Sequence, residues 1–233
     1  MRSGQRLDLS MYVRALPMLV RHPSIMVMPL LAAVVDLLVS SVSPLVNDPL
    51  GGLTQGIFQF FVQIIYGFAF GIAVIQASDI WRGRRGTFDD AWEEGRRKAG
   101  GIIMATIGFY FLLYVAGYIG GFLGAVQIAL EILAAFFLIY TIPAAAIGGL
   151  PGGLAISGSF RAARANIPGT IVLAIVFFLL WVLLPQAIVV YAGLHLTPLL
   201  FELVIAVIRA IVLGYLAFPF AKQYDDIAFS GRW

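Results

Sequence analysis

The sequence predicts an all-α, polytopic membrane protein whose six transmembrane helices form three hairpins. Hydrophobic residues make up 61% of the 233 residues, and charged residues make up 12%. A soluble globular domain has roughly 45–50% apolar and about 25% charged residues. A chain of this length could not hide such an excess of apolar side chains from water, so most of it is expected to lie in lipid.

Six apolar runs give the expected spans, because a helix needs about 20 apolar residues to cross the hydrocarbon core. They are Ser24–Val46, Gly56–Ile80, Gly100–Gly120, Val126–Gly148, Pro168–Ala192 and Thr197–Phe220. Residues 1–23 are expected to be an amphipathic cytoplasmic segment, 24–220 the transmembrane domain and 221–233 a cytoplasmic tail. The first run begins too late for the short apolar region of a cleaved signal peptide, so the N-terminus is expected to be retained.

The positions of the basic residues predict the orientation. Cytoplasmic loops collect Lys and Arg. Every basic residue except Arg209 lies before the first run, between the second and third, between the fourth and fifth, or after the sixth. This pattern predicts a multi-pass protein of the cell (inner) membrane with both termini in the cytoplasm. It also explains the sequence pI near 9.3 without a nucleic-acid partner.

Two segments that join a charged stretch to an apolar run resemble each other in sequence. They are Thr87–Gly108 and, with weaker similarity, Gly158–Val176. A fainter third copy is Arg14–Leu30. Tyrosines recur in the second, fourth and sixth runs at Tyr66, Tyr140 and Tyr215. The simplest interpretation is three hairpins related by a pseudo-axis along the membrane normal. The alternative is that any junction between a cytoplasmic loop and a span is basic and then apolar.

These junctions are predicted to form short amphipathic helices at the cytoplasmic surface. Thr87 can cap such a helix, with Asp90 completing a capping box. Two i,i+4 ion pairs of favourable order follow, Glu93–Arg97 and Glu94–Lys98. The alternative is a solvated linker with ordinary flanking charge.

The segment Leu138–Leu180 resembles a bacterial and archaeal family of membrane domains that includes the membrane domain fused to some glycerophosphodiester phosphodiesterases. The resemblance rests on small residues, a glycine-bearing turn and a Ser-aromatic-x-x-x-Arg-x-Asn element, here Ala144–Ala146, Gly148–Gly153, Ser159, Phe160, Arg164 and Asn166. It implies a multi-span helical domain. The chain has no phosphodiesterase domain, so that activity does not transfer, and the family supplies no catalytic residues.

Four ionisable residues lie well inside the apolar runs: Asp36, Glu131, Glu202 and Arg209. Such residues are costly in a membrane and by default indicate a functional site. Asp36 and Arg209 are both near mid-depth and are predicted to pair. Glu131 and Glu202, with Gln59, could form a ring around a cavity open to the outside, where a shared proton would permit proton coupling. The alternative is a structural polar cluster that holds the hairpins together.

Enzymatic chemistry is largely excluded. The chain has no cysteine, so thiol catalysis and Cys-ligated metals are absent. The two histidines, His22 and His195, are expected on opposite sides of the membrane, and no nucleotide-binding or metalloprotease motif occurs. We therefore expect no catalytic residue, no metal and no cofactor.

The leading functional hypothesis is a non-enzymatic membrane module: a scaffold, an assembly factor or an accessory subunit that contacts lipids and other membrane proteins. Self-association is the alternative to a different protein as its partner. The alternative is a transporter or channel for a small solute. A third hypothesis is lipid handling at the cytoplasmic interface by basic residues that could bind anionic headgroups, namely Arg96, Arg97, Lys98, Arg161 and Arg164. These five residues also fit ordinary positive flanks of membrane spans.

Overall fold

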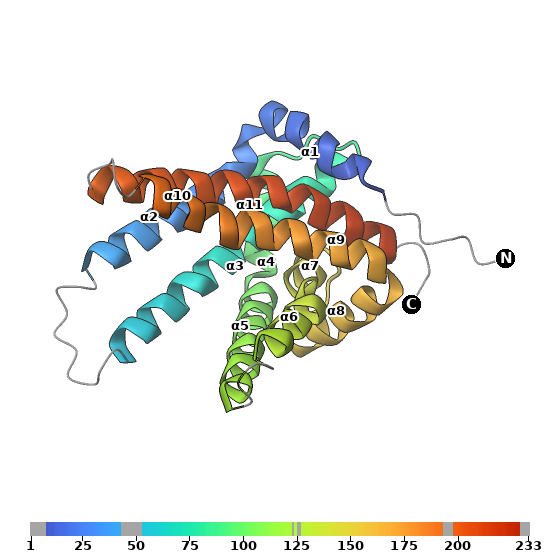
Figure 1. Ribbon diagram of the computed structural model, residues 1–233. Coiled ribbons are helices and arrows are strands. Elements are labelled where there is room, and N and C mark those ends of the chain that lie inside the picture. Colours follow the sequence, from blue (N-terminus) through green and yellow to red (C-terminus); the bar gives the residue numbers. More distant parts are fainter. Residues whose placement is uncertain (1–7, 43–52, 123, 125–126, 193–197, 229–233) are drawn as a thin grey trace.

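The computed structural model describes residues 8–42, 53–122, 124, 127–192 and 198–228, and these are mostly helical with no strand among them (Figure 1). This confirms the all-α class. The elements are α1 (Ser10–Arg21), η1 (Pro23–Met26), α2 (Val27–Val42), α3 (Leu53–Trp81), α4 (Phe88–Arg97), α5 (Ala99–Phe122), α6 (Gln127–Leu138), α7 (Thr141–Ala146), α8 (Gly153–Ala165), α9 (Ile167–Phe177), η4 (Phe178–Leu183), α10 (Leu184–Ala192) and α11 (Pro198–Ala228).

Six stretches of these helices are long and apolar enough to cross a membrane, which confirms the predicted number of spans. They are Pro23–Ser41, Thr54–Trp81, Ala99–Phe122, Gln127–Ala146, Ile167–Ile188 and Leu200–Ala228. Consecutive spans pack on each other as α2 with α3, α5 with α6, and α9 to α10 with α11. The result is three hairpins, each preceded by a short helix: α1, α4 or α8. Descent of the three units from one repeat stays a prediction.

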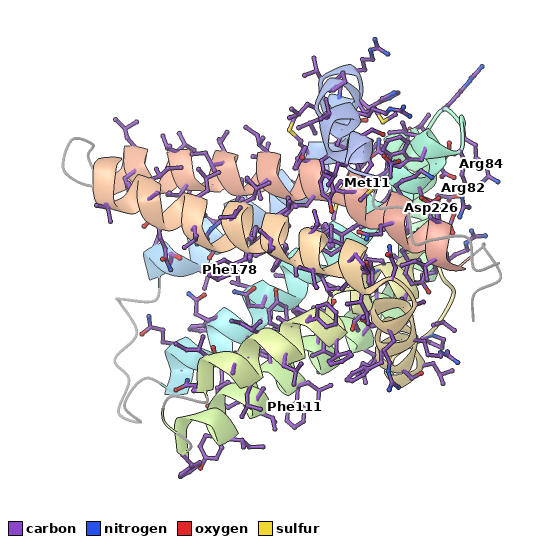
Figure 2. The ribbon with its side chains drawn as sticks, turned by 45° about the vertical axis from the view of Figure 1, so that its right-hand side comes forward. Met11, Arg82, Arg84, Phe111, Phe178 and Asp226 are labelled. Carbon is purple, nitrogen blue, oxygen red and sulfur yellow. The ribbon has the colours of Figure 1, made fainter. Side chains whose placement is uncertain are left out.

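We call the side of the bundle that holds α1, α4, α8 and the end of α11 the junction side, and the opposite side the far side. The junction side is the one predicted to be cytoplasmic. Figure 1 and Figure 2 both show that α3, α5 and α6 diverge from α10 and α11 toward the far side. The fully buried side chains gather toward the junction side, and Tyr140, Phe218 and Tyr224 are among the largest of them.

The last helix differs from its prediction. We expected the sixth span to end at Phe220 and residues 221–233 to form a tail, but α11 continues to Ala228. Ala221, Tyr224 and Ile227 are buried in the core. The extension therefore belongs to the packed bundle, because its apolar residues recur at helical spacing.

The fourth and fifth spans are interrupted helices. Span four breaks between α6 and α7, where Pro143 has no N–H to bond the carbonyl of Ile139. Span five passes from α9 to α10 through the π-helical turn η4. Such turns are rare and occur frequently at functional sites.

Thr87 caps the junction helix α4 as predicted, but the Asp90 carboxylate accepts from the Thr87 hydroxyl over 2.6 Å and not from the backbone N–H of a capping box. The Thr87 hydroxyl oxygen accepts from the Asp90 backbone N–H at 3.3 Å, and Lys98 pairs with Glu94 at 2.6 Å. The predicted Glu93–Arg97 pair is wrong, because Glu93 contacts Arg96 instead, at 3.5 Å.

Candidate functional site

Asp36, Tyr66 and Arg209 meet near the middle of the bundle, one each from α2, α3 and α11. The Tyr66 hydroxyl donates to Asp36 Oδ2 over 3.1 Å, and Arg209 Nη1 donates to the same oxygen. The predicted pairing of Asp36 with Arg209 is therefore present. It neutralises two of the four intramembrane charges, which lowers the cost of burying either one.

Trp181 joins this group from the π-helical turn. Its ring meets the Tyr66 ring edge to face, with centroids 5.5 Å apart and planes at 77°. We call Asp36, Tyr66, Trp181 and Arg209 the Asp36 cluster. Its four residues come from four elements of two hairpins, namely α2 and α3 of the first hairpin and η4 and α11 of the third.

Sequence reasoning missed the roles of Tyr66 and Trp181. The sequence marks Tyr66 only as one of three tyrosines that recur in alternate spans. The signal that could have found it is chemical: a carboxylate at mid-depth needs donors, and a tyrosine inside a span is one of the few that an apolar run supplies. Trp181 lies wholly inside an apolar run, but nothing in the sequence marks the π-helical turn that positions it.

The cluster is unevenly exposed. The Asp36 side chain is 10% exposed, whereas that of Arg209 is 36% exposed. A guanidinium carries five N–H donors, and Asp36 accepts from one of its nitrogens. The arrangement therefore holds a fixed, neutralised ion pair whose cationic member retains donors on an accessible side.

The predicted ring of Gln59, Glu131 and Glu202 is not assembled. Glu131 accepts from Gln127 Nε2 over 2.9 Å on its own helix and lies against Gly117 of α5. Glu202 is exposed on α11. The main neighbours of α6 are α5, α8 and α9, whereas α11 packs chiefly on α2 and α3. The two glutamates therefore occupy separate surfaces.

The basic candidates for headgroup binding divide into two kinds. Lys98 Nζ is engaged within the protein, donating to Glu94 over 2.6 Å and to the Ala146 carbonyl over 2.7 Å. It thereby satisfies a carbonyl in the last turn of α7. Arg96, Arg97, Arg161 and Arg164 are exposed.

The residues that carried the family resemblance support the break in span four. Ser159 accepts from the Tyr140 N–H at 3.0 Å and donates to the Phe137 carbonyl at 2.7 Å, so it satisfies both sides of the break. Phe160 stacks on Phe137 with planes 7° apart. Asn166 caps α9 by accepting from the Gly169 N–H at 3.3 Å. In the structure, the Ser159 and Asn166 side chains of this motif therefore bond backbone groups.

Among the described residues, no group of three or more acidic or histidine side chains could hold a metal ion. Comparison with protein-family models, with curated proteins and with solved structures finds no match. The resemblance to the glycerophosphodiester phosphodiesterase membrane domain therefore remains an expectation from the sequence.

Proposed function

We propose that this protein is a non-enzymatic integral membrane module that serves as a scaffold, assembly factor or accessory subunit for other membrane proteins. The observation that carries the proposal is an aromatic face along α5. Its members are all more than half exposed and share one side of the helix: Met104, Phe111, Tyr114, Tyr118 and Phe122. Figure 2 labels Phe111 on this face.

The distribution of burial supports the same conclusion. Only 17% of the most apolar stretch of span three and 18% of that of span five is buried, against 61% in the last span. Spans three and five are therefore peripheral, and their faces need cover from lipid or from other helices. Aromatic residues are enriched where proteins meet, which favours a protein partner on the α5 face.

Native mass spectrometry of the protein, gently extracted from its own membrane, tests this proposal. We expect a stoichiometric protein partner that is lost when Phe111 and Tyr118 are both replaced by alanine. Leu38→Ala is the matched control, because Leu38 is 60% exposed on a different span. A wild-type protein that emerges as a lone protomer or a homo-oligomer would contradict the proposal.

A second candidate function, transport of a small solute, is favoured by the Asp36 cluster. A polar group at mid-depth beside a π-helical turn is the kind of feature found on solute pathways. Flux of candidate solutes into proteoliposomes, compared between the wild type and the neutral double variant Asp36→Asn with Arg209→Met, tests this function. Equal flux through the wild type and the double variant would contradict a transport function that uses the Asp36 cluster.

A further inference from the structure

The far half of α3 carries a row of glutamines that ends at the Asp36 cluster. Gln55, Gln59 and Gln63 follow one another at intervals of four residues, and Tyr66 comes three residues later. Residues three and four apart lie on one side of a helix. The row therefore forms a polar strip that leads from the far side of the membrane to the tyrosine that donates to Asp36.

Exposure is highest at the outer end of this strip and lowest at its inner end. Gln55 is exposed, Gln59 and Gln63 are partly exposed, and Tyr66 is only 3% exposed. The lipid-facing side of α3 is a different one and is apolar, with Ile57 and Phe61 about half exposed or more. The glutamines therefore do not lie on the face of α3 that is built for hydrocarbon.

The amides on this strip need hydrogen-bond partners. Within the described part of the chain, the structure gives neither Gln59 nor Gln63 a side-chain hydrogen bond. A primary amide left without a hydrogen-bond partner in an apolar medium is strongly unfavourable, because it has lost its bonds to water. Two such groups on one side of a span are hard to reconcile with a covering of lipid tails.

The strip points toward span five without packing tightly against it in its far half. Its inner end faces η4, because the Tyr66 ring contacts Trp181. Farther out, α3 and α10 diverge (Figures 1 and 2), and the main neighbours of α3 are α2, α5 and α11. Phe178, at the start of η4, is half exposed.

Toward the junction side, aromatic rings close the route. Phe70 meets Phe220 with ring centroids 5.1 Å apart, and Phe177 meets Phe220 at 6.0 Å. Phe177 also stacks beside Trp181 at 6.5 Å. These rings come from three spans and lie directly beyond the Asp36 cluster.

We propose that the glutamine strip of α3 lines a water-filled vestibule. It opens on the far side, reaches Arg209 and is closed beyond that residue by Phe70, Phe177 and Phe220. Its occupants are water and small polar solutes, because amide, phenol and guanidinium groups all hydrogen-bond them. This inference deepens the transport candidate, but hydration of the strip is measured without any flux, so either one can fail alone.

The absence of cysteine from the chain makes the test direct, because each single-cysteine variant starts from a thiol-free background. Gln59→Cys and Gln63→Cys report on the strip. Phe61→Cys and Ile65→Cys are the matched controls, since they lie at similar depth on the exposed apolar side of α3. Each variant is placed in lipid nanodiscs and treated with a charged, water-borne methanethiosulfonate, which reacts with the thiolate form.

We expect the two strip variants to react at least tenfold faster than the two controls, with Ala73→Cys, beyond the aromatic closure, as slow as the controls. Strip thiols as inert as the controls, in variants whose thermal unfolding matches the wild type, would overturn the vestibule. So would fast reaction of Ala73→Cys, since the route would then not be closed.

Discussion

Arg82 and Asp225 form a two-pronged ion pair that fastens the end of α3 to the end of α11. Arg82 Nε donates to Asp225 Oδ2 over 3.1 Å, and Nη2 donates to Oδ1 over 2.9 Å. The Ser78 hydroxyl adds a third bond to Oδ2 at 2.9 Å. The Asp225 side chain is 12% exposed, so this pair is a largely buried polar link between the first and third hairpins on the junction side.

Replacing Asp225 by alanine leaves all three donors without their shared acceptor. Hydrogen bonds to charged groups contribute about 1.5–3 kcal/mol each when partly buried, so we expect a loss of about 2 kcal/mol or more, read as a lower midpoint of thermal unfolding. Asp226→Ala is the control. Asp226 is 54% exposed and pairs with Lys222 on its own helix, and exposed pairs contribute about 0–1 kcal/mol. Equal losses in the two variants would mean that the pair does not fasten the hairpins.

Breaking the Asp36–Arg209 pair is expected to cost more than removing it. Asp36→Asn or Arg209→Met alone leaves one partner uncompensated at mid-depth, which costs about 3–5 kcal/mol. The double variant removes both charges and is expected to recover most of that loss. Tyr66→Phe, which deletes one donor to Asp36, is expected to cost about 1 kcal/mol. Thermal unfolding of the wild type, the two single variants and the double variant in one detergent gives the double-mutant cycle. Strictly additive losses of stability in the two single variants would rule out a direct pair.

Ser159 is expected to hold the break in span four. Ser159→Ala strands the Phe137 carbonyl and the Tyr140 N–H together, and each buried group without a partner costs about 1–3 kcal/mol. Ser157→Ala is the matched control on the same helix, because its hydroxyl bonds only to the Leu154 carbonyl at an exposed position. The thermal midpoints of the two variants should differ clearly, and coincident midpoints would show that water replaces Ser159.

Spans and hairpins could be predicted from the sequence because hydrocarbon thickness and loop charge act on local stretches of chain. The capping of α4 by Thr87 and the Glu94–Lys98 pair are local as well. The continuation of α11 to Ala228 differs from the prediction although Ala221, Tyr224 and Ile227 recur at helical spacing, because the polar residues Lys222, Asp225 and Asp226 between them resemble the start of a tail. Their partners include α3, and contact between distant helices leaves no mark on a local pattern.

The site was predicted only where charge required it. The pairing of Asp36 with Arg209 could be predicted, because an unpaired charge at mid-depth in the membrane is too costly. Glu131 and Glu202 were grouped by equal spacing along the chain, which says nothing about which helices are neighbours. In the structure Glu131 accepts a hydrogen bond from Gln127, one turn away on the same helix. The equal spacing of the two glutamates does not predict this contact. Tyr66, Trp181 and the π-helical turn depend on the packing of three hairpins and could not be placed beforehand.

Gly67 permits close contact between α3 and α5. A Cβ there would lie 2.2–2.9 Å from side-chain atoms of Thr106, closer than packed atoms can approach. Gly67→Ala is therefore expected to force the helices apart, at a cost of about 1–3 kcal/mol, visible as a lower unfolding midpoint. Gly56→Ala, on the same helix with open space around it, should be neutral or slightly stabilising. Thr106→Ala should partly rescue Gly67→Ala, and absence of rescue would place the clash elsewhere.

Glu131 and Glu202 are expected to behave as independent residues, since they lie on helices that are not main neighbours. Glu131→Gln keeps an acceptor for Gln127, so it should change stability little, and Glu202→Gln removes a charge from an exposed position. Distant substitutions add within about 0.3–0.5 kcal/mol, so the double variant should equal the sum of the single changes. A coupling above about 1 kcal/mol, or one that appears only at low pH, would instead indicate a proton shared between the two carboxylates and would restore the ring that the sequence predicted.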